Sequence, residues 1–267
     1  MFILGLGAPK SGTTWLDRYI SRNSLAQPIA PNGKKEAHFW DRRSATRPLP
    51  VVIRRSFDAA LGKRLVTPLQ YFARIKMLLR QGFQVVTDIT PAYSLLSPRE
   101  LQRIAAGLET HRIDYRVVFI MRDPVARAIS KVKQDHFRKL FREYGGAETV
   151  PEMLETALAN RIFDNQVHYA EALPNIKEAF PEEKTFIAIL EELMTPKGVN
   201  DLSDFLGWNP DPDYSSVLVG STPSGPTELS PELLLGLQTY FREDYDYVAE
   251  GFPQVKNLWP SFSKGQP

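Results

Sequence analysis

The chain has 267 residues, of which 43% are hydrophobic, and this is enough for one sizeable domain with a substantial core. Its formal net charge of +2 provides no overall field for binding nucleic acid. It contains no cysteine, which excludes disulfides and cysteine nucleophiles, and its four histidines lack metal-binding spacing, so we expect no metal. We expect a cytoplasmic protein, because Met1 directly precedes an apolar run and no stretch is apolar enough to span a membrane.

The first predicted element is an apolar strand at residues 2–6, followed by Gly-Ala-Pro-Lys-Ser-Gly-Thr-Thr-Trp at 7–15 and a helix over 13–23. Glycines let the backbone bend close to a ligand, and the helix that follows directs free N–H groups at an anion. The loop also offers polar donors: Lys10, Ser11, Thr13 and Thr14. We therefore predict a phosphate-binding loop.

The spacing of this loop departs from both common phosphate-binding fingerprints. Gly7 and Gly12 have the separation of a P-loop, but Thr13 occupies the position of its lysine. Gly5 and Gly7 would begin a dinucleotide fingerprint, but Lys10 occupies its third glycine position. A P-loop kinase or NTPase and a non-catalytic nucleotide-binding module remain as alternatives.

Strand and helix signals alternate along the chain, which predicts an α/β fold: one domain over residues 1–267, with a central parallel sheet flanked by helices. Residues 24–66 are rich in proline and arginine, and we expect them to be mostly irregular. The remaining predicted elements are, in chain order, a helix at 67–82, a strand at 83–87, a helix at 97–108, a strand at 116–121, a helix from 124 to about 142, helices from 151 and over 162–180, a strand at 185–190, and short helices near 199–206 and 231–249.

The predicted strand at 116–121 is followed by Arg122-Asp-Pro-Val-Ala-Arg-Ala-Ile-Ser130. Arg122 leaves the carboxyl end of the strand, where ligands bind in open α/β sheets. Its guanidinium offers a planar fork of donors to a phosphate. Ser130 lies about two turns along the helix that follows, while Arg127 could contact the ligand or brace the helix against an acid. We interpret this stretch as a second phosphate-binding segment.

The two segments together resemble the nucleotide-binding motifs of sulfotransferases that use 3′-phosphoadenosine 5′-phosphosulfate (PAPS). Pro-Lys-Ser-Gly-Thr-Thr-Trp is similar to the 5′-phosphosulfate loop, and Arg-Asp-Pro-x-x-Arg-x-x-Ser is similar to the 3′-phosphate motif. The resemblance implies a P-loop-like sulfotransferase fold, PAPS as donor and the bisphosphate PAP as product, with Lys10 stabilising the leaving phosphate. The donor-site residues that it implies are Lys10, Ser11, Gly12, Thr13, Thr14, Trp15, Arg122 and Ser130.

A third segment, Lys34-Lys-Glu-Ala-His-Phe-Trp-Asp41, resembles the stretch that carries the catalytic glutamate in heparan sulfate O- and N-sulfotransferases. This implies that Glu36 is the general base, since sulfuryl transfer requires the attacking hydroxyl or amine to lose a proton. His136 is the alternative base, because cytosolic hormone and phenol sulfotransferases use a histidine. We expect His38 to line the acceptor site, and it is a weaker alternative as base.

Thr87-Asp-Ile-Thr-Pro-Ala-Tyr93 resembles the Glu-Lys-Thr-Pro-Ala-Tyr segment near the acceptor in the same subgroup, with Ile89 in place of the lysine. This adds Pro91 and Tyr93 as acceptor-site candidates, whereas residues 219–225 match the adenosine loop of the family poorly. We expect a small-molecule, saccharide or lipid acceptor. Basic stretches near 42–64 and 131–142 are either solvated surface or attract an anionic acceptor, including a lipid headgroup at a membrane surface.

Overall fold

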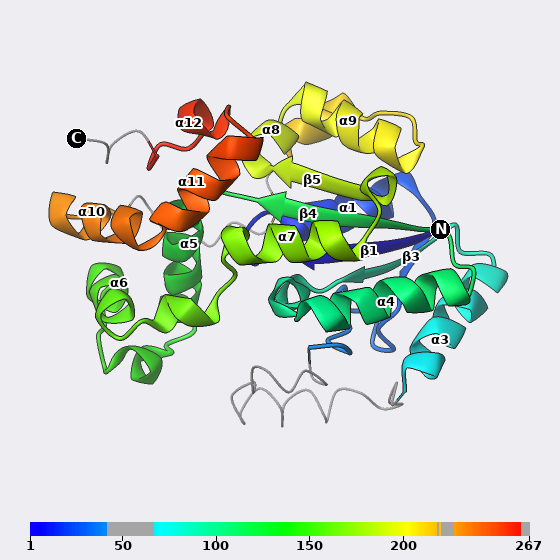
Figure 1. Cartoon of the computed structure of the whole chain (residues 1–267), viewed down its shortest axis with the longest axis horizontal. Helices are drawn as coiled ribbons and strands as arrows, with labels where there is room; N and C mark the ends of the chain where they lie inside the picture. The colour runs from blue at the N-terminus through cyan, green and yellow to red at the C-terminus, as the bar shows by residue number, and fades with distance from the viewer. Residues whose placement is uncertain (42–66, 218, 220–226, 263–267) are drawn as a thin grey trace.

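The computed structural model describes residues 1–41, 67–217, 219 and 227–262. Within them, parallel strands form one sheet in the order β2-β3-β1-β4-β5, as Figure 1 shows for its main strands. The strands are β1 (Phe2–Gly7), β2 (Ala26–Pro28), β3 (Val85–Ile89), β4 (Tyr115–Met121) and β5 (Thr185–Ile189). Every residue of β1 and β3 is buried, as is typical of parallel strands covered on both faces. The predicted α/β fold with a central parallel sheet is confirmed.

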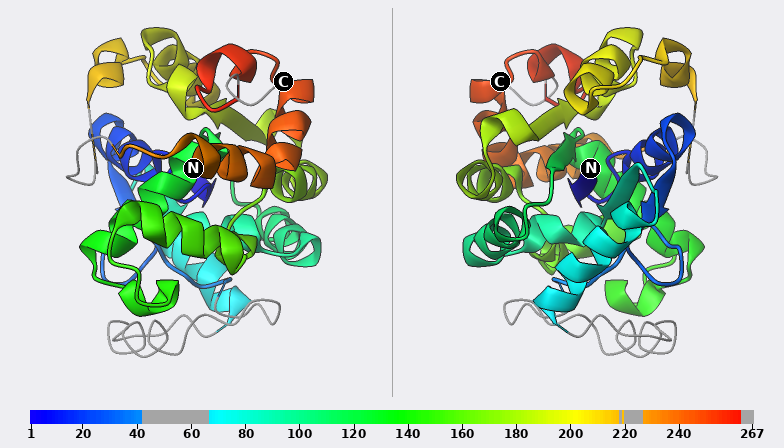
Figure 2. Two further views of the ribbon diagram at one scale, coloured as in Figure 1. Left: turned by 90° about the vertical axis from the view of Figure 1, so that its left-hand side faces the viewer. Right: turned by 90° about the vertical axis from the view of Figure 1, so that its right-hand side faces the viewer.

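Helices cover both faces of this sheet (Figure 2). On one face, Leu4 and Val117 pack with α4 and α7; on the other, Ile3 and Val118 pack with α1 and α9. The helices are α1 (Thr13–Asn23), α3 (Pro68–Arg80), α4 (Pro98–Thr110), α5 (Pro124–Phe137), α6 (Val150–Ala159), α7 (Tyr169–Ala179), α8 (Leu190–Leu193), α9 (Pro196–Leu206), α10 (Pro231–Tyr240), α11 (Arg242–Gly251) and α12 (Val255–Leu258). A short 3₁₀ helix, η1 (Pro91–Leu95), follows β3.

Side-chain caps fix where several of these helices begin. Thr67 and Ser97 each form the capping box that opens α3 and α4. Asp123 caps α5 by accepting hydrogen bonds from the backbone N–H groups of Val125, at 2.9 Å, and Ala126, at 3.3 Å. Helix α5 therefore starts directly after β4, and this leaves Arg122 at the turn between them.

The structure differs from the predicted elements at several places. The predicted helical stretch 162–180 begins with a 3₁₀ helix at Ile162–Asn165, and α7 starts only at Tyr169. Strand β2 lies within the stretch expected to be irregular; it is a three-residue edge strand ending in Pro28, too short to give a periodic pattern. Strand β3 begins at Val85, two residues later than predicted. Helix α5 ends at Phe137 rather than near 142, because Lys139 adopts a left-handed conformation with φ +56°.

Some predictions concern residues that the structure leaves undescribed. The basic residues between 42 and 64 and the loop at 220–225 lie outside the described ranges. The assignment of the whole chain to one domain stays a prediction. Among the helices of the described residues, none combines the length and the apolar character needed to cross a membrane.

Candidate active site

The loop between β1 and α1 has the backbone conformation expected of a close ligand approach. Gly7 and Gly12 have φ values of +132° and +82°. A Cβ added to Gly12 would lie 2.6 Å from Leu190 Cδ1, so conformation and space both require glycine there. Lys10 also has a left-handed backbone, with φ +66°, which is uncommon for a side chain of this size and is seen often at functional sites.

The structure brings this loop against the second phosphate-binding segment, 112 residues further along the chain. The Arg122 guanidinium donates a hydrogen bond to the carbonyl oxygen of Lys10, at 3.1 Å. The backbone of Arg122 is in turn held by the Tyr169 hydroxyl, which accepts from its N–H at 3.0 Å and donates to its carbonyl at 2.8 Å. Tyr169 is a residue that the sequence analysis missed.

A cavity of about 690 Å³ opens at the carboxyl ends of the strands, and both segments line it. This is a volume typical of small-molecule sites, in the position expected for an open α/β sheet. The predicted donor-site residues that line it are Lys10, Gly12, Thr13, Thr14, Trp15, Arg122 and Ser130. The candidates for the base and the acceptor site that line it are Glu36, His38 and Pro91.

Another cavity, of about 800 Å³, lies near Met1 at the opposite ends of the strands. None of the predicted site residues lines it. Its cationic side chains already have acidic partners, since Arg22 pairs with Asp211 at 2.8 Å and Arg116 pairs with Asp114 at 3.1 Å. The candidate active site is therefore the cavity that both phosphate-binding segments line.

Some predicted site residues do not line that cavity. The side chains of Ser11 and Tyr93 are fully buried, and the Tyr93 hydroxyl faces the segment that carries Glu36. His136 lies in the last turn of α5, where its ring packs against Phe141 with 5.6 Å between ring centroids. Tyr93 therefore contacts the segment that carries Glu36 rather than the cavity.

Arg127 braces α5 and does not face the cavity. Its side chain is 1% exposed and donates a hydrogen bond to the Val167 carbonyl oxygen at 2.7 Å. Its guanidinium also lies over the ring of Tyr169, 5.3 Å from the centroid. The sequence left open whether Arg127 contacts the ligand or braces the helix. The structure supports the second role, and the partners of Arg127 are a backbone carbonyl and an aromatic ring rather than an acid.

The cavity is strongly cationic. Burial and the neighbouring charges of Arg138, Arg122 and Lys131 lower the pKa of Lys10. Lys133 also lines the cavity, whereas Lys139 and the other basic residues further along do not. Crowded positive charges favour an anionic ligand, because an anion relieves the repulsion that lowers the pKa of Lys10.

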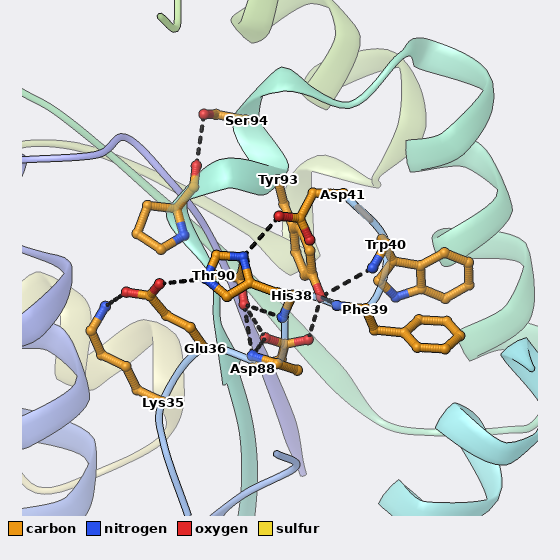
Figure 3. Close-up of polar contacts among 12 residues, drawn as sticks. Lys35, Glu36, His38, Phe39, Trp40, Asp41, Asp88, Thr90, Tyr93 and Ser94 are labelled. Atoms are coloured by element: carbon orange, nitrogen blue, oxygen red, sulfur yellow. Dashed lines mark hydrogen bonds and ion pairs between the residues drawn. The ribbon is translucent and has the colours of Figure 1, made fainter. Parts of the chain in front are cut away.

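Glu36 belongs to a chain of ionic contacts along its segment (Figure 3). One carboxylate oxygen accepts from Lys35 Nζ at 2.7 Å, and the other contacts His38 Nε2 at 2.9 Å. The opposite ring nitrogen, Nδ1, contacts Asp41 Oδ2 at 2.8 Å. His38 thus lies between two carboxylates, and its own backbone is left-handed, with φ +50°. Asp41 is the last residue of the segment that carries Glu36, but the sequence did not indicate that it contacts His38.

These contacts fix the charge states of the two central groups. Burial alone would lower the pKa of His38, but hydrogen bonds with Asp41 and Glu36 outweigh it and raise the pKa to about 9. Burial alone would raise the pKa of Glu36, but the hydrogen bond with His38 and the charge of Lys35 lower it to about 2. At neutral pH, Glu36 is therefore a carboxylate and His38 an imidazolium.

A sulfotransferase from Alicyclobacillus acidocaldarius has a similar fold, with a TM-score of 0.57 and 20% sequence identity over 94% of this chain and 95% of its own. A mouse sulfotransferase, SULT7A1, solved in complex with PAP, is more distant: its TM-score is 0.44 and its identity 13%, over 96% of this chain and 86% of its own. No curated protein sequence matches the chain.

The family assignment rests on the sequence itself. The sulfotransferase domain family matches residues 2–217, which include both phosphate-binding segments and the segment that carries Glu36. The match covers most of the chain, and it confirms the resemblance that the motifs indicated. This chain belongs to the sulfotransferase domain family.

Proposed function

We propose that this protein transfers a sulfuryl group from PAPS to a hydroxyl or amine of an acceptor. One observation carries the proposal: a single cavity is lined by the loop with Lys10, by Arg122 at the start of α5, and by the carboxylate of Glu36. Membership of the sulfotransferase domain family supports sulfuryl transfer as the reaction. The donor, the residue roles and the acceptor are inferences from the cavity.

The donor occupies the half of the cavity formed by the two phosphate-binding segments. The N-terminus of α1 and Lys10 bind the phosphosulfate, while Arg122 and Ser130 bind the 3′-phosphate. As the sulfur–oxygen bond to the bisphosphate breaks, negative charge grows on the leaving phosphate, and Lys10 stabilises it. These cations meet the charge of the leaving group, so we expect full activity in the presence of a metal chelator.

Glu36 takes the proton of the acceptor. The acceptor oxygen or nitrogen attacks sulfur in line with the departing bisphosphate, and its proton passes to the carboxylate. With a pKa of about 2, Glu36 is a weak base at rest. The attacking atom becomes strongly acidic as it bonds to sulfur, so a weak base suffices late in the reaction. His38 is protonated at neutral pH, and its role is to keep Glu36 ionised and oriented.

The acceptor is a small molecule, a saccharide or a lipid. An anionic group on it would suit the cations of α5 and its C-terminal end, since Lys131, Lys133 and Arg138 line the cavity. A panel of acceptors incubated with labelled PAPS identifies the substrate. Added salt should then raise the acceptor KM if such an anion is bound.

Isothermal titration separates this proposal from its alternatives. We expect PAP to bind without metal, and ATP with Mg²⁺ to bind poorly, because Thr13 replaces the lysine that a P-loop requires. Tight binding of ATP–Mg²⁺ without binding of PAP would support a P-loop kinase or NTPase instead. Binding of PAP with no transfer from labelled PAPS to any acceptor would indicate a non-catalytic nucleotide-binding module.

A further inference from the structure

Asp88, near the end of β3, is a carboxylate that the proposed reaction does not use. Its side chain is 0% exposed and does not line the cavity. Burial raises its pKa, although several hydrogen bonds oppose that effect. A buried carboxylate is costly, and apolar residues of similar volume are often better tolerated at such positions. The hydrogen bonds of Asp88 indicate which interactions offset this cost of burial.

Both oxygens of Asp88 accept hydrogen bonds. Oδ1 accepts from the hydroxyl of Thr90 at 2.6 Å and from the backbone N–H of Ala37 at 3.2 Å. Oδ2 accepts from the hydroxyls of Tyr71 at 2.7 Å and Tyr93 at 3.0 Å. A carboxylate can accept hydrogen bonds on both oxygens at once. An asparagine at this position would direct its NH₂ group at groups that themselves donate hydrogen bonds.

Most of these contacts lead to the segment that carries Glu36 (Figure 3). The Ala37 N–H also donates to the hydroxyl of Thr90, at 3.0 Å. The hydroxyl of Tyr93 accepts from the backbone N–H groups of Phe39, at 2.9 Å, and Trp40, at 3.4 Å. The backbone is therefore held on both sides of residue 38, once through Thr90 and once through Tyr93.

Residue 38 is where such support is needed. His38 has φ +50°, a conformation that costs free energy for a residue with a side chain and persists only when its surroundings enforce it. In this conformation the ring reaches Glu36 with one nitrogen and Asp41 with the other. A relaxed backbone at position 38 would move the ring away from both carboxylates.

We propose that Asp88 is a positioning residue, which holds Glu36 and His38 in place for proton transfer by ordering Thr90 and Tyr93 against the backbone of residues 37–40. The proposal rests on the proposed role of Glu36. Tyr71 provides an internal comparison. Its hydroxyl donates to the same oxygen of Asp88 as that of Tyr93. Tyr71 contacts the segment by packing its ring against the rings of Phe39 and Trp40, at 5.1 and 5.3 Å between centroids, whereas the Tyr93 hydroxyl accepts from the backbone N–H groups of these residues.

The test compares Tyr93→Phe with Tyr71→Phe, each of which removes one hydroxyl from Asp88. NMR titration of His38 in the free protein needs no acceptor. We expect Tyr93→Phe to lower the pKa of His38 below about 9, because the ring loses its geometry between Glu36 and Asp41, and Tyr71→Phe to leave it near the wild-type value. Amide exchange at Phe39 should also quicken in Tyr93→Phe.

Turnover adds a second measurement once an acceptor is known. A misplacement of about 1 Å in a reacting group can cost about 100-fold in rate, so we expect a loss of that order in Tyr93→Phe and a much smaller one in Tyr71→Phe. Asp88→Asn should resemble Tyr93→Phe if it folds. PAP affinity should be unchanged in all three variants.

Equal loss of melting temperature in the two tyrosine variants, with the His38 pKa and turnover unchanged in both, would overturn the proposal and leave Asp88 a purely structural residue. Failure of the wild-type protein to bind PAP would instead contradict the proposed function. That result would not alter the NMR comparison, so the two failures are distinguishable.

Discussion

The two halves of the cavity are built in different ways. The donor half consists of contiguous segments, each at the end of a buried strand and the start of a helix: 7–15 between β1 and α1, and 122–130 between β4 and α5. Its groups are backbone N–H donors and fixed cations. The other half carries Glu36 on a segment with no helix or strand of its own, held by side chains from β3 and η1.

This contrast indicates that the proposed donor half draws mainly on local structure, whereas the segment of the proposed base is held by distant side chains. A strand, a glycine turn and a helix start suffice to direct N–H groups at a phosphate. The backbone of the segment that carries Glu36 donates hydrogen bonds to Asp88 and Tyr93, more than 50 positions further along the chain. Substitutions in the two halves should therefore be separable by donor binding: those in the half with Glu36 should lower turnover and leave PAP affinity unchanged.

The largest expected effect is that of Glu36→Gln, which keeps the shape of the side chain and removes its basicity. Loss of a general base typically costs about 100- to 10,000-fold in turnover, and we expect a loss in this range. His136→Ala is the control, since His136 lies outside the cavity. An inactive His136→Ala beside an active Glu36→Gln would reverse the assignment of the base.

Lys10→Ala tests the part of the donor half that we propose binds the phosphosulfate. Removing one preorganised donor that stabilises a developing oxyanion costs about 100- to 1,000-fold in kcat, so we expect a loss of that order. The measurement is steady-state turnover at saturating donor. Turnover close to the wild-type value would show that the loop does not hold the phosphosulfate.

Arg122→Ala should act mainly on binding. Hydrogen bonds to charged groups are worth about 1.5–3 kcal/mol, so we expect the donor KM to rise by roughly 10- to 100-fold, with a smaller change in kcat. Lys139→Ala is the matched control, because Lys139 is an exposed cation close to α5 that does not line the cavity. A similar rise in KM for both variants would indicate a general charge effect rather than a phosphate contact.

The smallest effect is on stability. The raised pKa of His38 stabilises the fold below about pH 6.5, and this contribution disappears as the pH rises through about 9. The lowered pKa of Glu36 contributes above about pH 4.5 and is lost as the pH falls through about 2. The difference in melting temperature between wild type and His38→Asn should therefore be greatest near pH 4.5–6.5. A difference that does not vary with pH would contradict the ion pairs.

The sequence predicted the parts of this protein that depend on neighbouring residues. The cap at Ser97, the buried strand before Arg122 and the loop around Lys10 all have local signals. Strand β2 had none, because a three-residue edge strand has no period. The hydrogen bonds from Tyr169 to Arg122 join residues 47 positions apart, and no local pattern indicates such a contact.

Tyr93 illustrates what the sequence alone did not predict, namely the direction in which a side chain points. The resemblance placed it near the acceptor, and it does lie close to the site, but its ring is fully buried. Whether a tyrosine faces a cavity or the segment behind it depends on how β3 and η1 pack, which a single sequence does not specify. The local sequence thus located the neighbourhood of the site, and tertiary packing decided which side chains reach it.

Calorimetric titration of PAP into wild type, Glu36→Gln and Arg122→Ala tests most directly whether the cavity has a donor half and a separate base half. We predict that wild type and Glu36→Gln bind PAP with the same affinity, and that Arg122→Ala binds it more weakly. Absence of PAP binding to wild type, or an affinity lowered as much by Glu36→Gln as by Arg122→Ala, would contradict the account.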